Sequence, residues 1–103
     1  MENKNKKELL FLEGMDFDKD HISEIEDLFV EETIDFLNEN SETVKKNIEY
    51  LKELGVSNYQ DAFLRFYSMF IMVPEEFQKI FTKYDKVDLI AKLEKNISIM
   101  EHL

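Results

Sequence analysis

The first residues with the spacing of a chemical site are three alternating aspartates near the N-terminus, Asp16, Asp18 and Asp20. The calcium-binding EF-hand loop takes its first three carboxylate ligands from alternating positions, and Glu24 and Asp27 would stand at its ninth and twelfth positions. However, His21 replaces the glycine that lets such a loop turn sharply, and the sequence has no second loop to pair with it. The pattern therefore favours a solvated acidic segment in which Asp18 or Asp20 caps a helix, and we expect no metal or other cofactor.

A second acidic pattern follows directly, with carboxylates at i, i+3, i+7 and i+11: Glu24, Asp27, Glu31 and Asp35. On one continuous helix these side chains would form a ridge opposite much of the apolar stripe. A rise of about 1.5 Å per residue would place neighbouring carboxylates roughly 4.5 to 6 Å apart, close to the phosphate spacing of a nucleic-acid strand. The ridge is therefore typical of a nucleic-acid mimic, and equally of an ordinary solvated helix face.

Both patterns belong to a strongly acidic segment of the chain. Between Glu13 and Glu42, twelve acidic residues face a single lysine, Lys19, which gives this segment a net charge of −11, whereas the whole chain carries −10. Crowded like charges oppose folding, and such segments usually serve solubility, a cation or a basic partner. We expect a partner protein with a basic surface and no direct contact with nucleic acid or membrane, because a pI near 4.6 opposes binding to phosphate.

The sequence contains no recognisable catalytic motif. Its two histidines, His21 and His102, have no triad setting, and no His-x-x-x-His pair, glycine-rich phosphate loop or Gly-x-Ser-x-Gly elbow is present. We therefore expect a protein that is not an enzyme.

Several features of the composition favour a cytoplasmic location. The chain has no cysteine, no export signal at its N-terminus, and no apolar segment near the roughly 20 residues that cross a bilayer. Lysine supplies 12 of the 13 basic residues, a usage compatible with an AT-rich bacterial or phage genome.

Helix breakers are rare, with two glycines and one proline among 103 residues, and alternating strand patterns are absent. The sequence predicts one compact all-α domain, 1–103, of about six helices. The first covers 4–13 and stops at Gly14, and the second runs from 19 to 38 with an inward stripe of Ile22, Ile25, Phe29, Phe36 and Leu37. The remaining start and stop signals are Ser41 and Gly55 for the third helix, Ser57 with Gln60 for the fourth, Pro74 for the fifth and Asp85 for the last.

The fourth predicted helix is apolar on nearly every side. Its Phe and Met side chains serve either as core or as an adaptable contact surface for a second copy or another protein: Phe63, Phe66, Met69, Phe70 and Met72. Arg65 lies within this face and would need a carboxylate partner from the acidic helix if it were buried.

An internal echo links two parts of the chain, because Lys46 to Leu54 resembles Lys95 to Leu103 at an offset of 49 residues. This echo allows two related helical hairpins. The phrase NIEYLKELGVSN, followed by an apolar helix and Pro74, resembles the helical repeats of mitochondrial transcription termination factors. The resemblance covers roughly residues 44 to 100 and depends mainly on Leu51, Gly55 and Pro74; it implies stacked helices that hold nucleic acid in a basic groove.

Taken together, the patterns predict a small acidic interaction protein that binds a basic partner and regulates or inhibits it by mimicking nucleic acid. The predicted contact residues are Glu24, Asp27, Glu31, Asp35, Phe66 and Phe70. Two alternatives remain: a homo-oligomeric module that uses the apolar fourth helix, and a nucleic-acid-binding helical repeat.

Overall fold

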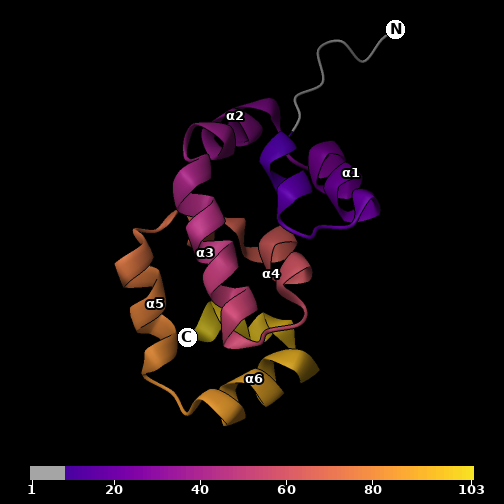
Figure 1. Ribbon diagram of the computed structural model, residues 1–103. Coiled ribbons are helices and arrows are strands. Elements are labelled where there is room, and N and C mark those ends of the chain that lie inside the picture. Colours follow the sequence, from indigo (N-terminus) through magenta and orange to yellow (C-terminus); the bar gives the residue numbers. More distant parts are fainter. Residues whose placement is uncertain (1–8) are drawn as a thin grey trace, which may run out of the picture.

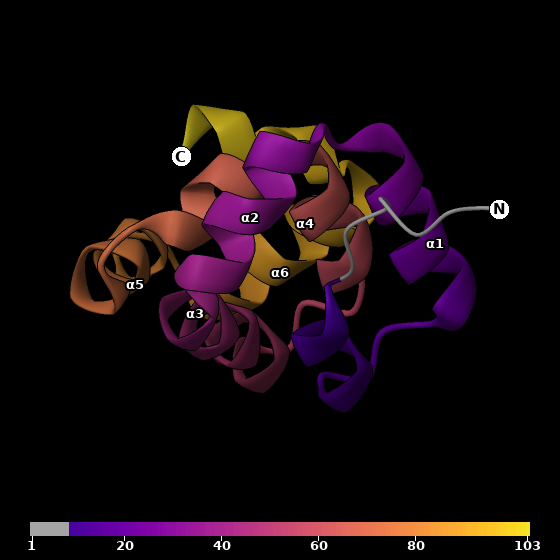
Figure 2. The ribbon, with the colours of Figure 1, turned by 90° about the horizontal axis from the view of Figure 1, so that it is seen from above.

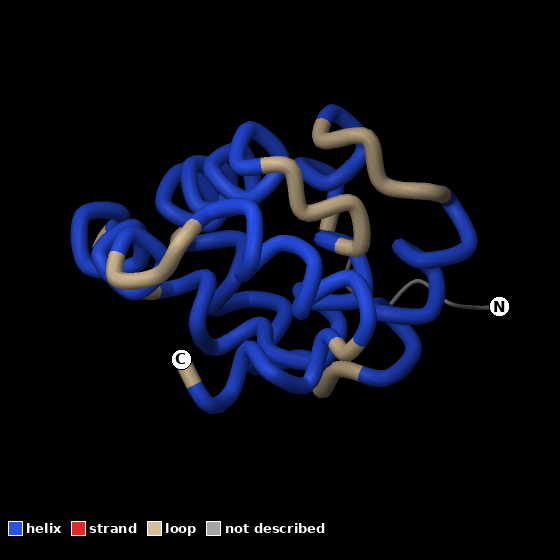
Figure 3. The backbone as a smooth tube through the Cα atoms, turned by 90° about the horizontal axis from the view of Figure 1, so that it is seen from below, coloured by secondary structure: helices blue, strands red, loops and turns tan. Residues whose placement is uncertain are grey.

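Few helix breakers interrupt the chain, and hydrophobic residues at helical spacing give most segments one face to bury. In the computed structural model, which describes residues 9–103, these segments form six α-helices and three 3-10 helices with no strand among them (Figure 1, Figure 3). The α-helices are α1 (Lys19–Leu28), α2 (Glu31–Glu39), α3 (Ser41–Leu54), α4 (Tyr59–Phe66), α5 (Pro74–Thr82) and α6 (Lys86–Lys95). The 3-10 helices are η1 (Leu10–Gly14), η2 (Tyr67–Ile71) and η3 (Ile97–His102). The prediction of a single all-α domain is confirmed.

Helix α3 runs through the middle of the molecule, with α2 at one end, α6 at the other and α5 alongside (Figure 1). Its buried face consists of Val44, Asn47, Ile48 and Leu51, as the hydrophobic spacing predicts for the three apolar residues. Gly55 ends the helix with a φ of 106°, a left-handed conformation that favours glycine. Its N–H donates to the carbonyls of Leu51 and Lys52, and the N–H of Val56 donates to Leu51, so the predicted glycine stop is confirmed.

The core is built around a chain of aromatic rings from four different parts of the sequence. Phe17, Phe63, Phe70, Phe77 and Phe81 follow one another with ring centroids 5.8, 5.3, 5.3 and 4.9 Å apart. Edge-to-face and tilted arrangements of this kind add to the free energy of burying apolar area. The core interpretation of Phe63 and Phe70 is therefore confirmed, because both side chains are completely buried.

The predicted helix over 19–38 is wrong, because the chain bends at Phe29 and Val30, whose backbones are extended. The ring of Phe29 packs against Tyr67 of η2, with centroids 4.6 Å apart, and the carbonyl of Val30 accepts the first hydrogen bonds of α2. The bend lets α1 pack against α4 and η1 while α2 packs against α3. Figure 2 shows α1 and α2 as two separate helices.

The fourth predicted helix also ends early, since α4 stops at Phe66 and the chain continues as η2. In a continuous α-helix the carbonyl of Phe70 would accept from residue 74, but Pro74 has no N–H and its ring would clash with that carbonyl. The side chain of Asn47 supplies the missing donor: Nδ2 donates to the carbonyls of Phe70, at 2.8 Å, and Met72, at 2.9 Å. Proline and the amide of Asn47 together account for the end of the apolar run at Phe70 to Met72, whereas α4 itself ends earlier, at the non-helical backbone of Phe66.

The predicted helix starts have mixed outcomes. Pro74 is the first residue of α5, and Asp85 accepts a hydrogen bond from the N–H of Asp88 at 3.0 Å, as predicted. The capping box of Ser57 and Gln60 is wrong: Ser57 donates to Glu94, and Gln60 accepts from the N–H of Asp18. The residue that precedes α3 is Asn40 rather than Ser41.

The N-terminal prediction is wrong where the structure describes it. Residues 4–8 of the predicted first helix lie outside the described part, and 10–14 form a 3-10 helix rather than an α-helix. The 3-10 helix ends at Gly14, and the residue with a left-handed backbone is Asp16, with a φ of 61°.

The echo between 46–54 and 95–103 does not correspond to a repeated structure. The first copy is part of α3, whereas the second crosses from the end of α6 into η3. Asn47 is buried, but its counterpart Asn96 is exposed and accepts from the N–H of Ser98. Two related hairpins are therefore not observed. Over residues 9–103, every helix is too short or too polar to cross a lipid bilayer.

Candidate functional site

The acidic segment forms the α1–α2 end of the molecule (Figure 1). Each helix is fixed by a narrow apolar face, Ile22 and Ile25 in α1 and Ile34 and Leu37 in α2. The bend between them carries Phe29, which is held by Tyr67. Because only these faces are needed for packing, the other sides of both helices present their polar residues to solvent.

The predicted ridge is divided by the bend. Glu24 and Asp27 belong to α1, whereas Glu31 and Asp35 belong to α2, so the regular spacing expected on one helix does not extend across all four. Glu24, Asp27 and Glu31 are exposed, and Asp35 is half-buried. The segment therefore presents two short acidic faces rather than a continuous line of carboxylates.

Part of this charge has a structural explanation and part does not. Glu31 and Glu32 lie in the first turn of α2, where negative charge is favourable to the helix dipole. Glu39 lies at the opposite end of α2, where no basic residue occupies the last turn and a carboxylate is unfavourable. Within residues 9–103, Glu24, Glu31 and Glu32 form no ion pair. Helix stability alone does not account for the arrangement.

Exposed apolar side chains accompany these carboxylates. Leu28 is 63% exposed, Val30 is 62% exposed and Phe36 is 49% exposed. The hydrophobic stripe predicted Phe36 to face inward, which is wrong because the bend rotates the buried face of α2 toward Ile34 and Leu37. No glycine or proline marks the bend, so Leu28, Val30 and Phe36 are not among the contacts predicted from the sequence.

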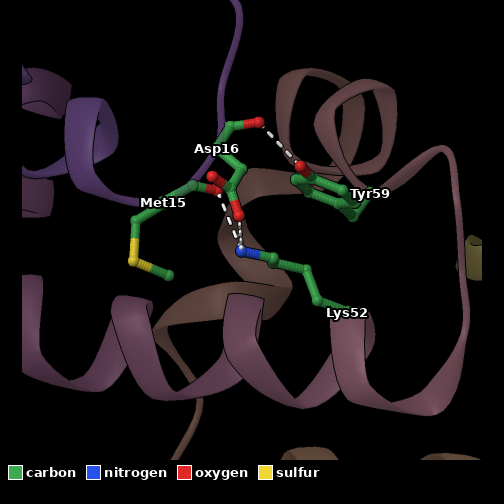
Figure 4. A network of polar contacts seen from close by, with 4 residues as sticks. All are labelled: Met15, Asp16, Lys52 and Tyr59. Carbon is green, nitrogen blue, oxygen red and sulfur yellow. Dashed lines mark hydrogen bonds and ion pairs between the residues drawn. The ribbon is translucent and has the colours of Figure 1, made fainter.

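A polar network fixes the turn that leads into α1 (Figure 4). Lys52 Nζ lies 2.7 Å from Asp16 Oδ2 and also donates to the carbonyl of Met15, while the hydroxyl of Tyr59 donates to the carbonyl of Asp16 at 2.7 Å. The hydrogen bond to Asp16 raises the pKa of Lys52 above its ordinary value of 10.5; partial burial opposes this, and the charges of Asp16, Tyr59 and Glu49 reinforce it. The network connects α3 and α4 to the beginning of the acidic segment.

This pairing predicts an alkaline loss of stability. The pKa of Lys52 is raised in the folded protein, so the Lys52–Asp16 pair gives its full stabilisation below pH 10.5. That stabilisation is lost as the pH rises through the folded pKa. Lys52→Met should lower the free energy of unfolding by about 1 kcal/mol or less near pH 7, since Asp16 is exposed, and the difference from wild type should shrink above pH 10.5. Urea denaturation at a series of pH values measures this difference, with the exposed Lys83→Met as control. A difference that stays constant through the alkaline range would contradict the assignment.

Two of the three alternating aspartates form contacts with other side chains. Asp16 pairs with Lys52, and Asp18 Oδ2 lies 3.3 Å from Nδ1 of His21. Asp18 precedes α1 at the expected position, but its side chain accepts no capping hydrogen bond, so the predicted side-chain cap is wrong. Among the described residues, no three acidic or histidine side chains gather as metal ligands would.

The two contact residues predicted on the fourth helix, Phe66 and Phe70, are partly or completely buried in the structure. Phe70 is completely buried, which removes it from any contact surface, and Phe66 packs partly against the core. Arg65 is exposed and pairs with Asp61 of its own helix at 3.5 Å, rather than with a carboxylate of the acidic helix.

A hollow of about 550 Å³ lies over α3, with Phe11, Met15 and Tyr50 among its lining residues. Its charged side chains are of both signs and all belong to α3: Glu42, Lys45, Lys46, Glu49 and Glu53. Lys45 and Glu42 form an ion pair at 3.3 Å. Unlike the α1–α2 segment, this hollow offers mixed charge and so favours neither a cation nor an anion.

Comparisons of the chain with protein-family models, with curated proteins and with solved structures give no match.

Proposed function

We propose that this protein is a non-enzymatic interaction protein that binds a basic surface of a partner protein through the α1–α2 segment. One observation carries the proposal: two adjacent helices display exposed carboxylates, and no lysine or arginine occurs between Lys19 and Lys45. Like charges crowded into one stretch of sequence oppose folding through self-repulsion, and a basic partner would relieve that repulsion.

The negative charge of the α1–α2 segment would mainly raise the rate at which a basic partner associates and the selectivity for that partner. A field of one sign steers a basic partner toward the segment and disfavours acidic proteins and nucleic acids. If the partner's basic surface itself binds nucleic acid, occupation by α1 and α2 would block that surface and inhibit the partner. Of the two alternatives, self-association through the fourth helix has weaker support because Phe63 and Phe70 are buried within one chain. A nucleic-acid-binding repeat is opposed by the net charge of −10.

Charge reversal at the segment tests the proposal. The variant Glu24→Lys/Glu31→Lys should bind a fluorescent oligolysine peptide at least about tenfold more weakly than wild type at low salt. Binding by wild type should weaken steeply as salt is added, because charges are screened within about 10 Å at 0.1 M. Fluorescence anisotropy measures both effects, and circular dichroism checks that the helices remain.

The matched control is Glu53→Lys/Glu101→Lys, which changes the net charge equally at exposed positions outside the segment. The control should retain near wild-type binding. Equal losses in the two variants would mean that only net charge matters and would reject the α1–α2 segment as the site.

A further inference from the structure

The bend between α1 and α2 forces apolar side chains into solvent. Phe29 points its ring at Tyr67, and the extended backbone at Phe29 and Val30 then places Val30 outside the fold. Leu28, the last residue of α1, is also mostly exposed. Two large, mostly exposed apolar residues therefore flank the partly buried Phe29 at the bend.

The exposed apolar residues of α1 and α2, Leu28 and Phe36, each have at least one carboxylate one helical turn away. Glu24 precedes Leu28 by four residues, which places both on one face of α1. On α2, Glu32 and Glu39 lie one turn before and one turn after Phe36, and all three are exposed. The combination of exposed apolar centres and surrounding carboxylates is complementary to a segment that has apolar residues bordered by lysine or arginine.

We propose that Leu28, Val30 and Phe36 are the apolar contacts of the site, and that its occupant is a basic amphipathic helix of a partner protein. This inference rests on the proposed function and narrows its partner from any basic surface to one that also carries apolar residues. A second copy of this chain fits poorly, because two segments of net charge −11 would face each other. A purely basic groove fits poorly as well, because it would leave the three apolar side chains unmatched.

Three peptide probes of about 14 residues test the inference: a Lys/Leu peptide with leucines at helical spacing, a scrambled peptide of the same composition, and oligolysine. The wild-type protein should bind the amphipathic peptide at least about tenfold more tightly than the scrambled peptide. It should also retain more of that affinity at about 0.5 M salt than it does for oligolysine. Fluorescence anisotropy with labelled peptides gives the dissociation constants.

The decisive variant is Leu28→Ser/Val30→Ser/Phe36→Ser, which should remove the preference for the amphipathic peptide and leave oligolysine binding unchanged. Its control, Val73→Ser/Tyr84→Ser/Val87→Ser, changes three exposed apolar residues on other elements and should keep the preference. Circular dichroism confirms that both triple variants are folded.

The outcomes separate the two proposals. If wild type binds all three peptides equally and the triple serine variant behaves in the same way, the amphipathic partner is rejected while the acidic binding function stands. Failure of wild type to bind any peptide rejects both. A concentration-dependent dimer in analytical ultracentrifugation that disappears in the first triple variant would instead identify a second copy as the occupant and overturn the inference.

Discussion

Replacing Phe70 with alanine is expected to lower the free energy of unfolding by about 3 to 5 kcal/mol, the usual cost of truncating a buried phenylalanine. Phe70 is completely buried, and its ring lies 5.3 Å from those of both Phe63 and Phe77. The truncation would leave a cavity in the middle of the aromatic chain and separate its two halves. Because domains of this size are stable by about 5 to 15 kcal/mol, the variant should be close to unfolding at moderate temperature.

Urea denaturation followed by circular dichroism measures the loss. The matched control is Phe36→Ala, which removes the same atoms from a side chain that is about half exposed and should cost about 1 kcal/mol or less. Equal effects at the two positions would contradict the assignment of Phe70 to the core. A stable Phe70→Ala protein with altered partner binding would instead return Phe70 to the contact surface.

Replacing Asn47 with alanine is expected to cost about 2 to 5 kcal/mol, since one buried and one partly buried carbonyl would lose their donor, and a buried group left without its partner costs about 1 to 3 kcal/mol. The amide of Asn47 holds the carbonyls of Phe70 and Met72, at sequence separations of 23 and 25 residues. Without it, the turn between η2 and α5 would lose its main polar attachment to α3. Asn47→Asp should be at least as damaging, because the shape is kept but an oxygen would face the two carbonyl oxygens.

The internal echo supplies the control for this prediction. Asn96 occupies the equivalent place in the second copy, is exposed, and accepts one local hydrogen bond from the N–H of Ser98. Asn96→Ala should therefore cost about 1 kcal/mol, as the loss of a helix cap does. Thermal denaturation of the three variants gives the comparison, and a small effect of both Asn47 changes would show that the buried amide is dispensable.

The candidate site could be anticipated only in part. The acidic character of the segment follows from composition, and Glu24 and Glu31 are exposed as expected. The prediction that Phe36 faces inward is wrong, because it assumes one continuous helix over 19–38. The bend starts a second helix whose buried face is set independently of the first. The ring of Tyr67, which holds Phe29 at the bend, comes from a distant part of the chain and leaves no local signal.

The amino-acid sequence by itself determined the helix ends that depend on a few neighbouring residues. Gly55 ends α3 because a residue without a side chain adopts φ of 106° without strain, and Asp85 begins α6 because its carboxylate reaches the amide of Asp88. What only the tertiary structure decided are the places where distant groups compete with local helix formation. Phe29 packs on Tyr67 where the predicted helix over 19–38 is divided, and Asn47 supplies the donor that Pro74 lacks where the apolar run after α4 ends. The exposure of Leu28 and Val30 follows from the first of these contacts, because burying Phe29 turns its neighbours toward solvent.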